Sequence, residues 1–599
     1  MATVGSILQV IPATWNNQAP TNDFLIQRTW QWTRNGVDIT GAMGGAYTLQ
    51  TADIGATISV REVAGFISSS NNGTTPETPA ITSSSTATGV GVTGSALNTL
   101  FVQRDNLVYQ GSFLMPSGFD YNGKGIVFNP SGFGSQKTLT AFGGVSGDYF
   151  VAGEFSIPTL TTITNQASLS TLQTATLLRP TPNPLDPSEG MRTSSGVVGD
   201  GGSYEYAGMA VAPSSKLLFT YENKYPNSQS YSVFYRRPFD LSATGSVEGP
   251  FIVIDPTYQT NARWAGGWMC PIPSMTVGGT NYQTALGGDF LAGANGLSII
   301  NSLSDGPCAI SFSSSAITAA LATSHSGTAQ GGNSTQIILA SSANATDGYY
   351  VGQYIVAASA CTGARRITAY VGSTRTATIS ANTDGQLWDV ATPTSSTTYK
   401  TTPYVSGRQL VGYVAGATAL DNGFGANKYA SIWGQNGGAR GMVIPNGTKS
   451  LLFIGLSGDG YNIYGTPGNV YGGIKIFDPE LVSQSPHSYS YTGKIWAYNL
   501  DELAAVYASP GTVGFNSVKP YAVWEFELPG AGTFGARACQ GATYDPETRI
   551  LYIAATVKDT PLGYGFGRVA VHAYLVNNAV STGTSPVMLT APSITVWRA

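Results

Sequence analysis

Gly441-Met-Val-Ile-Pro445, followed by Leu451-Leu-Phe-Ile454, is the stretch that decides the fold. A glycine and a proline bracket a short apolar strand, and a second apolar strand follows the turn. One such hairpin cannot bury its own apolar face, so neighbouring copies must cover it. Its recurrence over several hundred residues predicts a radial or stacked all-β architecture, of which a β-propeller fits best. The other copies are Gly125–Pro130, Gly208–Pro213 with Lys216–Tyr221, and Gly541–Pro546 with Ile550–Ile553.

The composition of the chain narrows its class. Charged residues are 10% of 599, less than half the usual share, whereas apolar residues remain at 42%. Gly, Ser, Thr, Asn and Tyr fill the difference, which is typical of an extracellular-style β protein whose surface presents hydroxyls and amides. Aromatic residues at 11% argue against a disordered chain. The net charge of -4 gives no electrostatic reason to expect nucleic acid or an anionic membrane as partner.

The cysteines and the N-terminus indicate where the chain matures. Cys270, Cys308, Cys361 and Cys539 are far apart, without a CxxC pair, and predict reduced, mostly buried thiols instead of a disulfide framework or a zinc site. The first residues lack the pattern of a signal peptide, and no run approaches the roughly 18 apolar residues of a membrane span. We therefore expect synthesis in a cytosol. Virus particles released by lysis would combine such synthesis with an extracellular-style surface.

Residues 1–82 predict a β-sandwich. The segment from Trp30 to Ile39 has a strand, an Asn-Gly turn and a second strand, and Ala46–Leu49 and Asp53–Val60 supply two more. The low-complexity Ser, Thr and Asn stretches that follow predict a linker over 83–96. The module resembles the immunoglobulin-like modules of bacteriophage virion proteins and bacterial surface proteins. That resemblance implies a core tryptophan, Trp30 or Trp32, and either a spacer or anchoring role or a ligand-binding one.

The body of the chain is predicted in two parts, 97–308 and 405–599, both with strands separated by Gly, Pro and Asn turns. One helix is expected at Asp501–Tyr507, with Asn499 as its cap. Through Leu107–Phe113, the Gly-to-Pro hairpins and Ile495–Leu503, the body resembles large propeller-like proteins of phage and environmental bacterial genomes. The resemblance implies a fold but no settled activity.

Residues 309–404 predict a small β domain inserted between the two parts of the propeller. Ser, Thr and Ala runs surround strand-like segments at Gly348–Val356, Gly363–Tyr370 and Thr376–Ile379. The segment resembles a small β module that recurs within phage tail and other virion proteins. An insertion at a blade loop would leave both flanks intact, because the ends of a loop can stay close together.

Motifs for chemistry are scarce in the sequence. No GxSxG, Walker or EF-hand pattern occurs, and the histidines His325, His487 and His572 form no HExxH or other paired arrangement. A structural role is expected for His572, which alternates within an apolar strand. Glycan cleavage stays open because it needs only two carboxylates from anywhere in the chain. The candidates are Glu154, Glu189, Asp289, Asp459 and Glu525.

Binding is better supported than catalysis. The Gly-rich stretch from Ser457 to Gly473 carries Asp459, Tyr461, Tyr464 and Tyr471, a composition suited to stacking on sugar rings with hydroxyl recognition, and equally to an inter-blade packing loop. A second aromatic pair, Trp264 and Trp268, could form a further ligand surface or simply pack the core. No catalytic residue, metal site or cofactor is expected.

These observations predict a structural component of a bacteriophage particle, an oligomer bound to other virion proteins. We expect it on the tail as a nozzle, fibre or receptor-contacting protein, with host-surface glycan as a candidate ligand. The alternatives are a capsid decoration protein, a virion-bound polysaccharide depolymerase, and a bacterial surface adhesin, which the missing signal peptide disfavours.

Overall fold

The computed structural model describes part of the chain, and every structural statement below refers to that part. Strands dominate it, so the prediction of an all-β protein is confirmed. The described residues are 2–3, 7–11, 24–43, 46–68, 80–86, 90–93, 100–116, 119, 125–143, 151–164, 166–181, 204–212, 216–223, 233–243, 247–255, 265–294, 306–317, 325–357, 359–361, 365–380, 387–388, 390–413, 438–458, 463–471, 474–476, 478, 484–487, 491–509, 514–526, 528–529, 539–557, 568–577 and 594–595.

The N-terminal module contains two sheets with a core between them. Trp32 is fully buried and stacks on Tyr47 of the other sheet at 5.5 Å between ring centroids. The expected Asn35-Gly36 turn is present, with positive φ at both residues. One sheet has β1 (Ala2–Thr3), β8 (Val90–Thr93), β6 (Thr57–Ser68), β3 (Phe24–Arg34) and β4 (Val37–Met43) in this order, with β7 (Ala80–Thr86) also on β6, and the other has β42 (Ile594–Thr595), β2 (Ile7–Ile11) and β5 (Ala46–Thr48).

The segment expected as a linker contributes strands to this module. β7 pairs antiparallel with β6 from Arg61↔Thr86 to Phe66↔Ala80, and β8 pairs with β6 at Thr57↔Gly91. The Ser and Thr residues that read as a linker are compatible with an extended edge strand, where a hydroxyl can face water.

The body consists of five four-stranded units, which we call sheets 1 to 5. Sheet 1 has β10 (Val127–Asn129), β11 (Thr138–Gly143), β12 (Val151–Ser156) and β13 (Leu177–Thr181). Sheet 2 has β14 (Tyr204–Ala212), β15 (Lys216–Asn223), β16 (Val233–Pro238) and β17 (Glu248–Ile254). Sheet 3 has β18 (Trp268–Pro271), β21 (Phe290–Gly293), β22 (Ala309–Phe312) and β30 (Tyr404–Val411). Sheet 4 has β31 (Gly438–Val443), β32 (Ser450–Gly458), β37 (Tyr491–Asn499) and β38 (Ala522–Phe526), and sheet 5 has β39 (Cys539–Asp545), β40 (Ile550–Val557), β41 (Arg568–Val576) and β9 (Leu107–Leu114).

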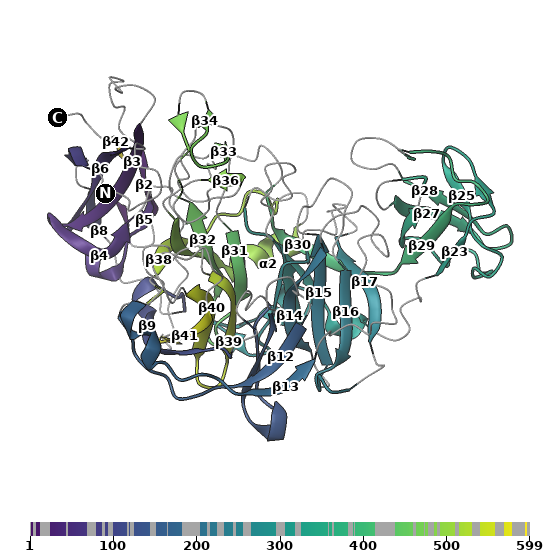
Figure 1. Cartoon of the computed structure of the whole chain (residues 1–599), viewed down its shortest axis with the longest axis horizontal. Coiled ribbons are helices and arrows are strands. Elements are labelled where there is room, and N and C mark those ends of the chain that lie inside the picture. The colour runs from purple at the N-terminus through teal and green to yellow at the C-terminus, as the bar shows by residue number, and fades with distance from the viewer. Residues whose placement is uncertain are drawn as a thin grey trace.

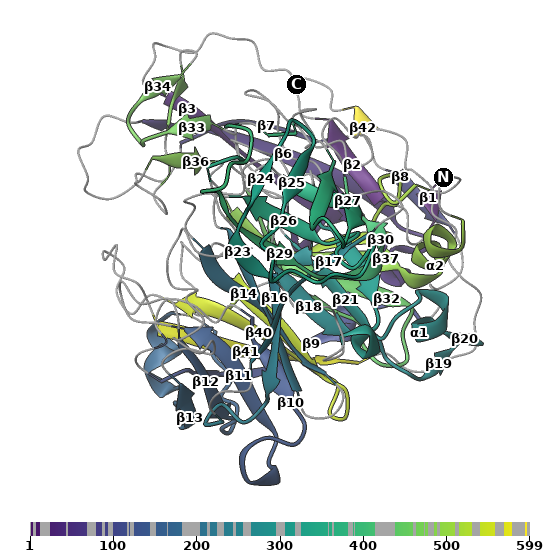
Figure 2. The same cartoon turned by 90° about the vertical axis from the view of Figure 1, so that its right-hand side faces the viewer.

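The first strands of the five sheets form a closed ring. β10 contacts β14, and the contacts continue through β18, β31 and β39 back to β10. Sheet 5 takes its fourth strand, β9, from the start of the body, so the two ends of the body lie in one sheet (Figures 1 and 2). In addition, β17 pairs in parallel with β30, which joins sheets 2 and 3 into eight strands that curl until β14 and β18 meet.

The glycines of the recurring hairpins lie where neighbouring first strands touch. A Cβ on Gly208 would lie 2.9 Å from the backbone of Trp268, and one on Gly441 would lie 2.6 Å from the backbone of Ala542. Register shifts mark the same place in β14, β31 and β39. Glycine is required there because any side chain would push the adjacent strands apart.

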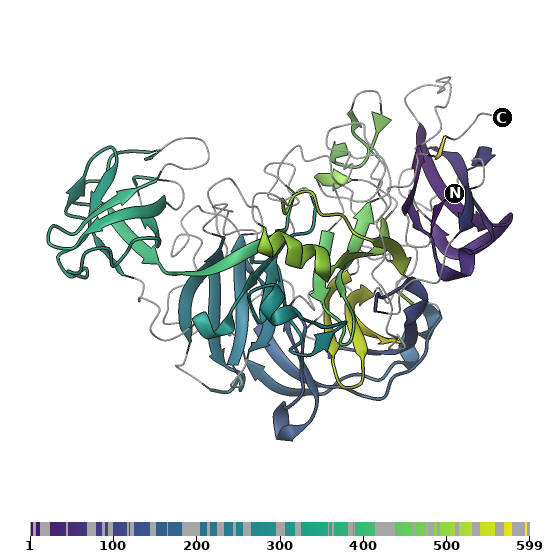
Figure 3. The ribbon, with the colours of Figure 1, turned by 180° about the vertical axis from the view of Figure 1, so that it is seen from behind.

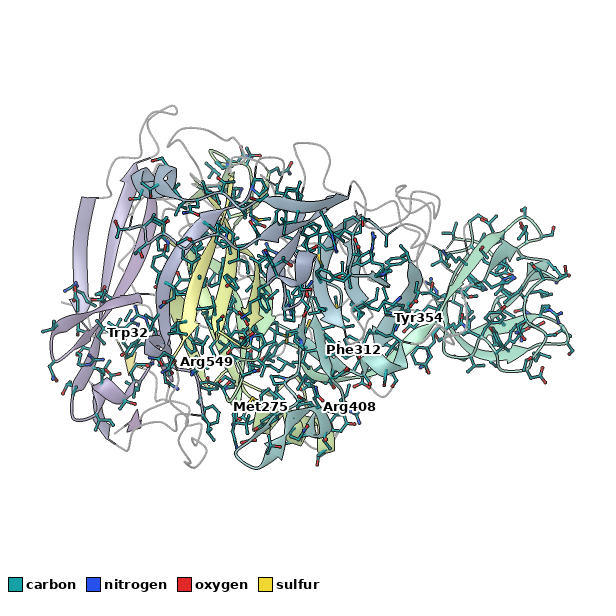
Figure 4. All side chains as sticks on the ribbon, turned by 90° about the horizontal axis from the view of Figure 1, so that it is seen from below. Trp32, Met275, Phe312, Tyr354, Arg408 and Arg549 are labelled. Atoms are coloured by element: carbon teal, nitrogen blue, oxygen red, sulfur yellow. The ribbon has the colours of Figure 1, made fainter. Side chains whose placement is uncertain are left out.

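The inserted domain follows β22 and returns to the body at β30. It is one sheet in the order β23 (Ser326–Thr328), β29 (Thr398–Thr402), β26 (Tyr354–Ala357), β27 (Arg365–Val371), β28 (Thr376–Ile379), β25 (Gln336–Ile338) and β24 (Gly331–Gly332). It lies at the end of the long axis opposite the N-terminal module (Figures 1 and 3). Tyr354 marks its junction with the body, where Val356 joins the apolar core of sheet 2 (Figure 4).

Helices are few and short. The expected helix is confirmed as α2 (Leu500–Ala508), and the Asn499 side chain accepts a hydrogen bond from the Asp501 backbone as its N-cap. It packs on sheet 4 and β30, and Lys449 pairs with Asp501 at 2.8 Å. The smaller elements are α1 (Tyr282–Ala285), the hairpin β19 (Thr276–Val277) and β20 (Thr280–Asn281), and 3-10 turns at Thr51–Asp53, Arg104–Asn106, Phe133–Ser135, Gln166–Thr171 and Ser314–Ala316.

The N-terminal module is docked on the body. Thr48 Oγ1 donates to the Val523 carbonyl at 3.3 Å and accepts from the Val523 amide at 3.0 Å. Strands β4 and β5 thereby cover β38, the edge strand of sheet 4. A covered edge cannot pair with another chain, so this contact protects the sheet as well as fixing the module.

Candidate functional site

An excursion from sheet 4 holds most of the residues that the sequence nominated for binding. We call the described residues from 463 to 487, between β32 and β37, the excursion. It has β33 (Ile463–Gly465) paired with β36 (Ser485–His487), and β34 (Val470–Tyr471) paired with β35 (Ile474–Lys475). Strand β35 contacts β3 of the N-terminal module, and Figures 1 and 2 show the excursion beside that module.

The nominated aromatic residues are only partly placed by the structure. Tyr464 lies on β33 and Tyr471 on β34, so two of the three tyrosines belong to one small substructure. Only the backbone of these two residues is described. Asp459, Tyr461 and Trp264 lie outside the described residues.

Trp268 packs the core of the body and offers no surface to a ligand. It is 4% exposed and meets Phe453 edge to face at 6.2 Å between ring centroids. Its indole lies against Gly293, where a Cβ would come within 2.3 Å of the ring nitrogen. Of the two readings that the sequence allowed, core packing fits this environment.

The base of the excursion is a buried polar cluster. His487 is 2% exposed, with Nδ1 2.7 Å from Asp478 Oδ2 and Nε2 3.0 Å from the Gly465 carbonyl oxygen. Tyr491, the first residue of β37, donates its hydroxyl to the same Asp478 oxygen at 2.7 Å. The cluster therefore ties both strands of the β33–β36 hairpin to sheet 4.

The sequence did not single out Asp478 and Tyr491, and it gave His487 no partner. Asp478 and His487 are nine residues apart in a stretch rich in Ser and Pro, which matches no ligand or catalytic spacing. Only the pairing of β33 with β36 brings them together, and no short-range sequence signal predicts that pairing.

The described carboxylate candidates are engaged in local structure. Glu154 is fully buried, and its Oε1 accepts from the Phe133 amide at 2.8 Å and from Thr138 Oγ1 at 2.7 Å. Asp289 accepts from the amide of Ser314, and Glu525 lies opposite Lys494 in the ladder of β38 and β37. Glu189 and Asp459 lie outside the described residues. The three described carboxylates come from sheets 1, 3 and 4 and are not gathered in one site.

Ser112 and His572 form a buried pair that resembles a nucleophile and its base. Ser112 Oγ lies 2.8 Å from His572 Nδ1 and 2.6 Å from Tyr109 Oη. Both residues are fully buried, and burial lowers the pKa of His572 to about 3. A base that weak, out of reach of solvent, is poorly suited to activate a hydroxyl. The pair instead joins β9 to β41 and closes sheet 5, in line with the structural role expected for His572.

The third histidine belongs to the inserted domain. His325 stacks on Tyr399, whose hydroxyl lies 2.9 Å from His325 Nδ1. Burial lowers the pKa of His325. Tyr350 and Tyr370 extend the same aromatic cluster into the core of the domain.

The cysteines and the groups that could bind a metal ion were predicted to have no functional role. All four cysteines are buried thiols that form no disulfide, as predicted, and burial raises the pKa of the Cys270 and Cys539 thiols. Within the described ranges, no group of three or more His, Cys, Asp or Glu side chains is arranged to hold a metal ion. No helix in the same ranges is long and apolar enough to cross a membrane.

Comparison with known proteins finds little. The sequence matches no family model and no curated protein. Among solved structures, a protein of unknown function from Dyadobacter fermentans is similar with a TM-score of 0.25 and 8% identity, over 79% of this chain and 100% of that one. A similarity at this level carries no argument about function.

Proposed function

We propose that this chain is a structural component of a bacteriophage particle, attached to the tail, which presents a binding surface to the host. The observation that carries the proposal is the mounting of two further β modules on opposite ends of a ring-shaped body (Figure 1). Such an arrangement suits a rigid spacer that joins one partner to another. The low content of charge and the hydroxyl-rich and amide-rich composition suit a surface exposed outside cells.

The proposal includes a fold for each part. For the body we propose a five-bladed β-propeller, supported by the closed ring of first strands and by the completion of sheet 5 with β9. For the N-terminal module we propose an immunoglobulin-like sandwich, supported by the buried Trp32 between its two sheets. Proteins with either fold have many unrelated functions, so the function must be argued from the surfaces and side chains that this chain presents.

A binding role is favoured over a catalytic one by the environments of the candidate acids. Glu154 and Asp289 hold backbone amides of neighbouring turns. An acid so engaged is a poor proton donor for a glycosidic bond. The excursion, with Tyr464 and Tyr471 on its strands, is the surface that we propose for host glycan or for a neighbouring virion protein.

Two measurements test the proposal. Mass spectrometry of gradient-purified particles from the source culture should find this chain in a fixed ratio to the other structural proteins. The purified chain should also leave host capsule intact while binding host cells. Clearing of capsule would replace the structural role by that of a depolymerase, and recovery of the chain with cells but never with particles would favour an adhesin.

A further inference from the structure

We propose that Asn35 is a site of spontaneous modification, at which the backbone nitrogen of Gly36 attacks the side-chain amide and converts Asn35 to aspartate or isoaspartate. The inference goes beyond the proposed function, because it concerns covalent ageing of the N-terminal module whatever surface the chain presents. The turn between β3 and β4 holds a nucleophile and an electrophile on adjacent residues, and β6 supplies a hydrogen-bond donor for the charge that develops.

The nucleophile is the backbone nitrogen of Gly36. Asn35 and Gly36 form a two-residue turn with φ of 49° and 79°, and both residues are exposed. Glycine has no Cβ beside its nitrogen, and a Cβ built on Gly36 would have no atom within 4 Å, so the surroundings of this nitrogen are open. No described residue accepts a hydrogen bond from the Gly36 amide. Solvent can therefore remove the proton of this amide, which leaves the nitrogen able to attack.

The electrophile is Cγ of Asn35, and the fold supplies a donor to the oxygen bonded to it. The Thr57 amide donates to Asn35 Oδ1 at 2.8 Å, and the Asn35 amide donates to the Thr57 carbonyl, also at 2.8 Å. Attack on Cγ places negative charge on Oδ1, the atom that already accepts from Thr57. A backbone donor fixed at this position stabilises the developing charge, as the donors of an oxyanion hole do.

The reaction needs water and no other reagent. A bond forms between Gly36 N and Asn35 Cγ, the bond between Cγ and Nδ2 breaks, and Nδ2 leaves as ammonia with the proton that the Gly36 amide has lost. Water then opens the cyclic imide. Opening at Cγ gives aspartate at position 35, whereas opening at the backbone carbonyl of that residue gives isoaspartate, in which the main chain runs through Cγ.

Either product changes the tip of the hairpin formed by β3 and β4. Aspartate adds a negative charge three residues before Asp38, which pairs with Arg61 at 3.0 Å. Isoaspartate adds a methylene group to the main chain within the turn that sets Arg34 opposite Val37. Because β3 also contacts β35, a loosened hairpin would alter the surface that the module shares with the excursion.

Asn446-Gly447 is the same dipeptide in a different environment. It lies in the turn between β31 and β32, where Gly447 also has positive φ, at 75°. Asn446 is half-buried, its Nδ2 donates to the Pro546 carbonyl at 3.5 Å, and no described residue donates to its Oδ1. The nitrogen that must leave is thus engaged, and the oxygen that must take up charge has no fixed donor. Conversion at Asn446 should therefore be slower.

Peptide mapping of the full chain by mass spectrometry tests the assignment. The folded chain is incubated in mildly alkaline buffer, and deamidation is followed at each position over weeks. Conversion at Asn35 should be at least about tenfold faster than at Asn446. In urea the two should react at similar rates, because the unfolded chain gives neither a fixed donor. A rate at Asn35 no higher than at Asn446, or a difference that persists in urea, would overturn the proposal.

Substitution of the glycine identifies the attacking nitrogen. Gly36→Ala places a Cβ beside that nitrogen and should slow conversion of Asn35 at least about tenfold. Gly55→Ala is the matched control, since Gly55 is also exposed, has φ of 80° and has no atom within 4 Å of its Cβ position. It strains the backbone similarly but leaves the nucleophile untouched, so the rate at Asn35 should not change. An unchanged rate in Gly36→Ala, or equal slowing by both variants, would contradict attack by Gly36.

Discussion

Asp53 illustrates how a chain with few charges uses each of them. It is fully buried in the N-terminal module and accepts from Arg34 Nε at 2.6 Å, Tyr47 Oη at 2.8 Å and the Gln50 amide at 2.7 Å. Burial together with the negative Asp53 raises the pKa of Tyr47 well above its ordinary value. One carboxylate thus fixes a turn, a strand and the ring that stacks on Trp32.

Glu502 is a residue whose ionised form is disfavoured in the folded protein. Burial raises its pKa from 4.5 to about 6, and the neighbouring Asp501 adds to the rise. The pKa of Glu502 is higher in the folded protein than in the unfolded chain. Its contribution to stability is therefore complete below pH 4.5, where the acid is neutral in both states, and it is lost as the pH rises through about 6. Glu502→Gln should therefore raise the apparent unfolding free energy at about pH 8 by about 1 kcal/mol and change nothing at about pH 4.

Urea titrations at the two pH values measure this difference. Glu547→Gln is the matched control, because Glu547 is 77% exposed and the same substitution should have little effect there. Equal effects of Glu502→Gln at both pH values would contradict the account.

His572 responds to pH in the opposite direction. Its pKa in the folded protein is about 3 and its ordinary value is 6.5, so stability is full above pH 6.5 and falls as the solution is acidified toward pH 3. The loss should reach at most about 1.4 kcal/mol per pH unit. His572→Gln should lower stability at neutral pH but flatten this decline, as thermal unfolding between about pH 7 and about pH 4 would show. An unchanged slope would mean that other groups dominate the acid response.

The hairpins are the elements that local sequence predicts best. A glycine, a short apolar run and a proline specify the first strand and its turn wherever they occur, and the structure has β10, β14, β31 and β39 at the four places. The pairing of β9 with β41 brings Ser112 beside His572, 460 residues away, and no local pattern encodes it. For the same reason the contact between Asp478 and His487 could not be predicted.

Trp268 shows where composition misleads. A tryptophan beside glycines suits a stacking platform, but here Gly208 lets a neighbouring strand approach the backbone of Trp268 and Gly293 lets another approach its indole. The Ser and Thr stretch near residue 83 misleads in the same way, because a linker and an edge strand share the same residue types. Long-range packing decides between the readings in both cases.

A glycine at the contact between first strands provides a test at the scale of the element. Gly441→Ala would bring a methyl group within 2.6 Å of Ala542, including its backbone, and should cost about 1–3 kcal/mol by forcing sheets 4 and 5 apart. Gly514→Ala is the control, since the nearest atom there is the side-chain oxygen of Asn516, which can move. Urea unfolding should give a lower free energy of unfolding for Gly441→Ala than for Gly514→Ala. Equal free energies of unfolding for the two variants would argue against close packing between the first strands of the ring.

The whole molecule is a body with two modules attached in different ways. The N-terminal module covers the edge strand β38, whereas the inserted domain leaves and re-enters sheet 3 between β22 and β30. These two strands pair from Ala309↔Val411 to Phe312↔Gly407 without help from the insert. The body should therefore tolerate loss of the insert much better than loss of the module that covers its edge.

Replacement of residues 318–402 by a short Gly-Ser linker tests this expectation. Removal takes away the packing of Val356 on sheet 2, so the melting temperature should fall by only a few degrees, while the body remains folded and keeps the oligomeric state of the full chain. Circular dichroism and light scattering measure both properties. Aggregation of the shortened chain would mean that the insert is part of the core of the body.

The central claim is that the chain belongs to a bacteriophage particle, and the most direct measurement is a cryo-electron-microscopy reconstruction of particles from the source culture. The account predicts density on the tail, in cyclic symmetry, into which the ring of five sheets and its two modules fit. Density over the capsid lattice would move the chain to a decorating role on the head. Absence of such density from every particle would contradict the claim.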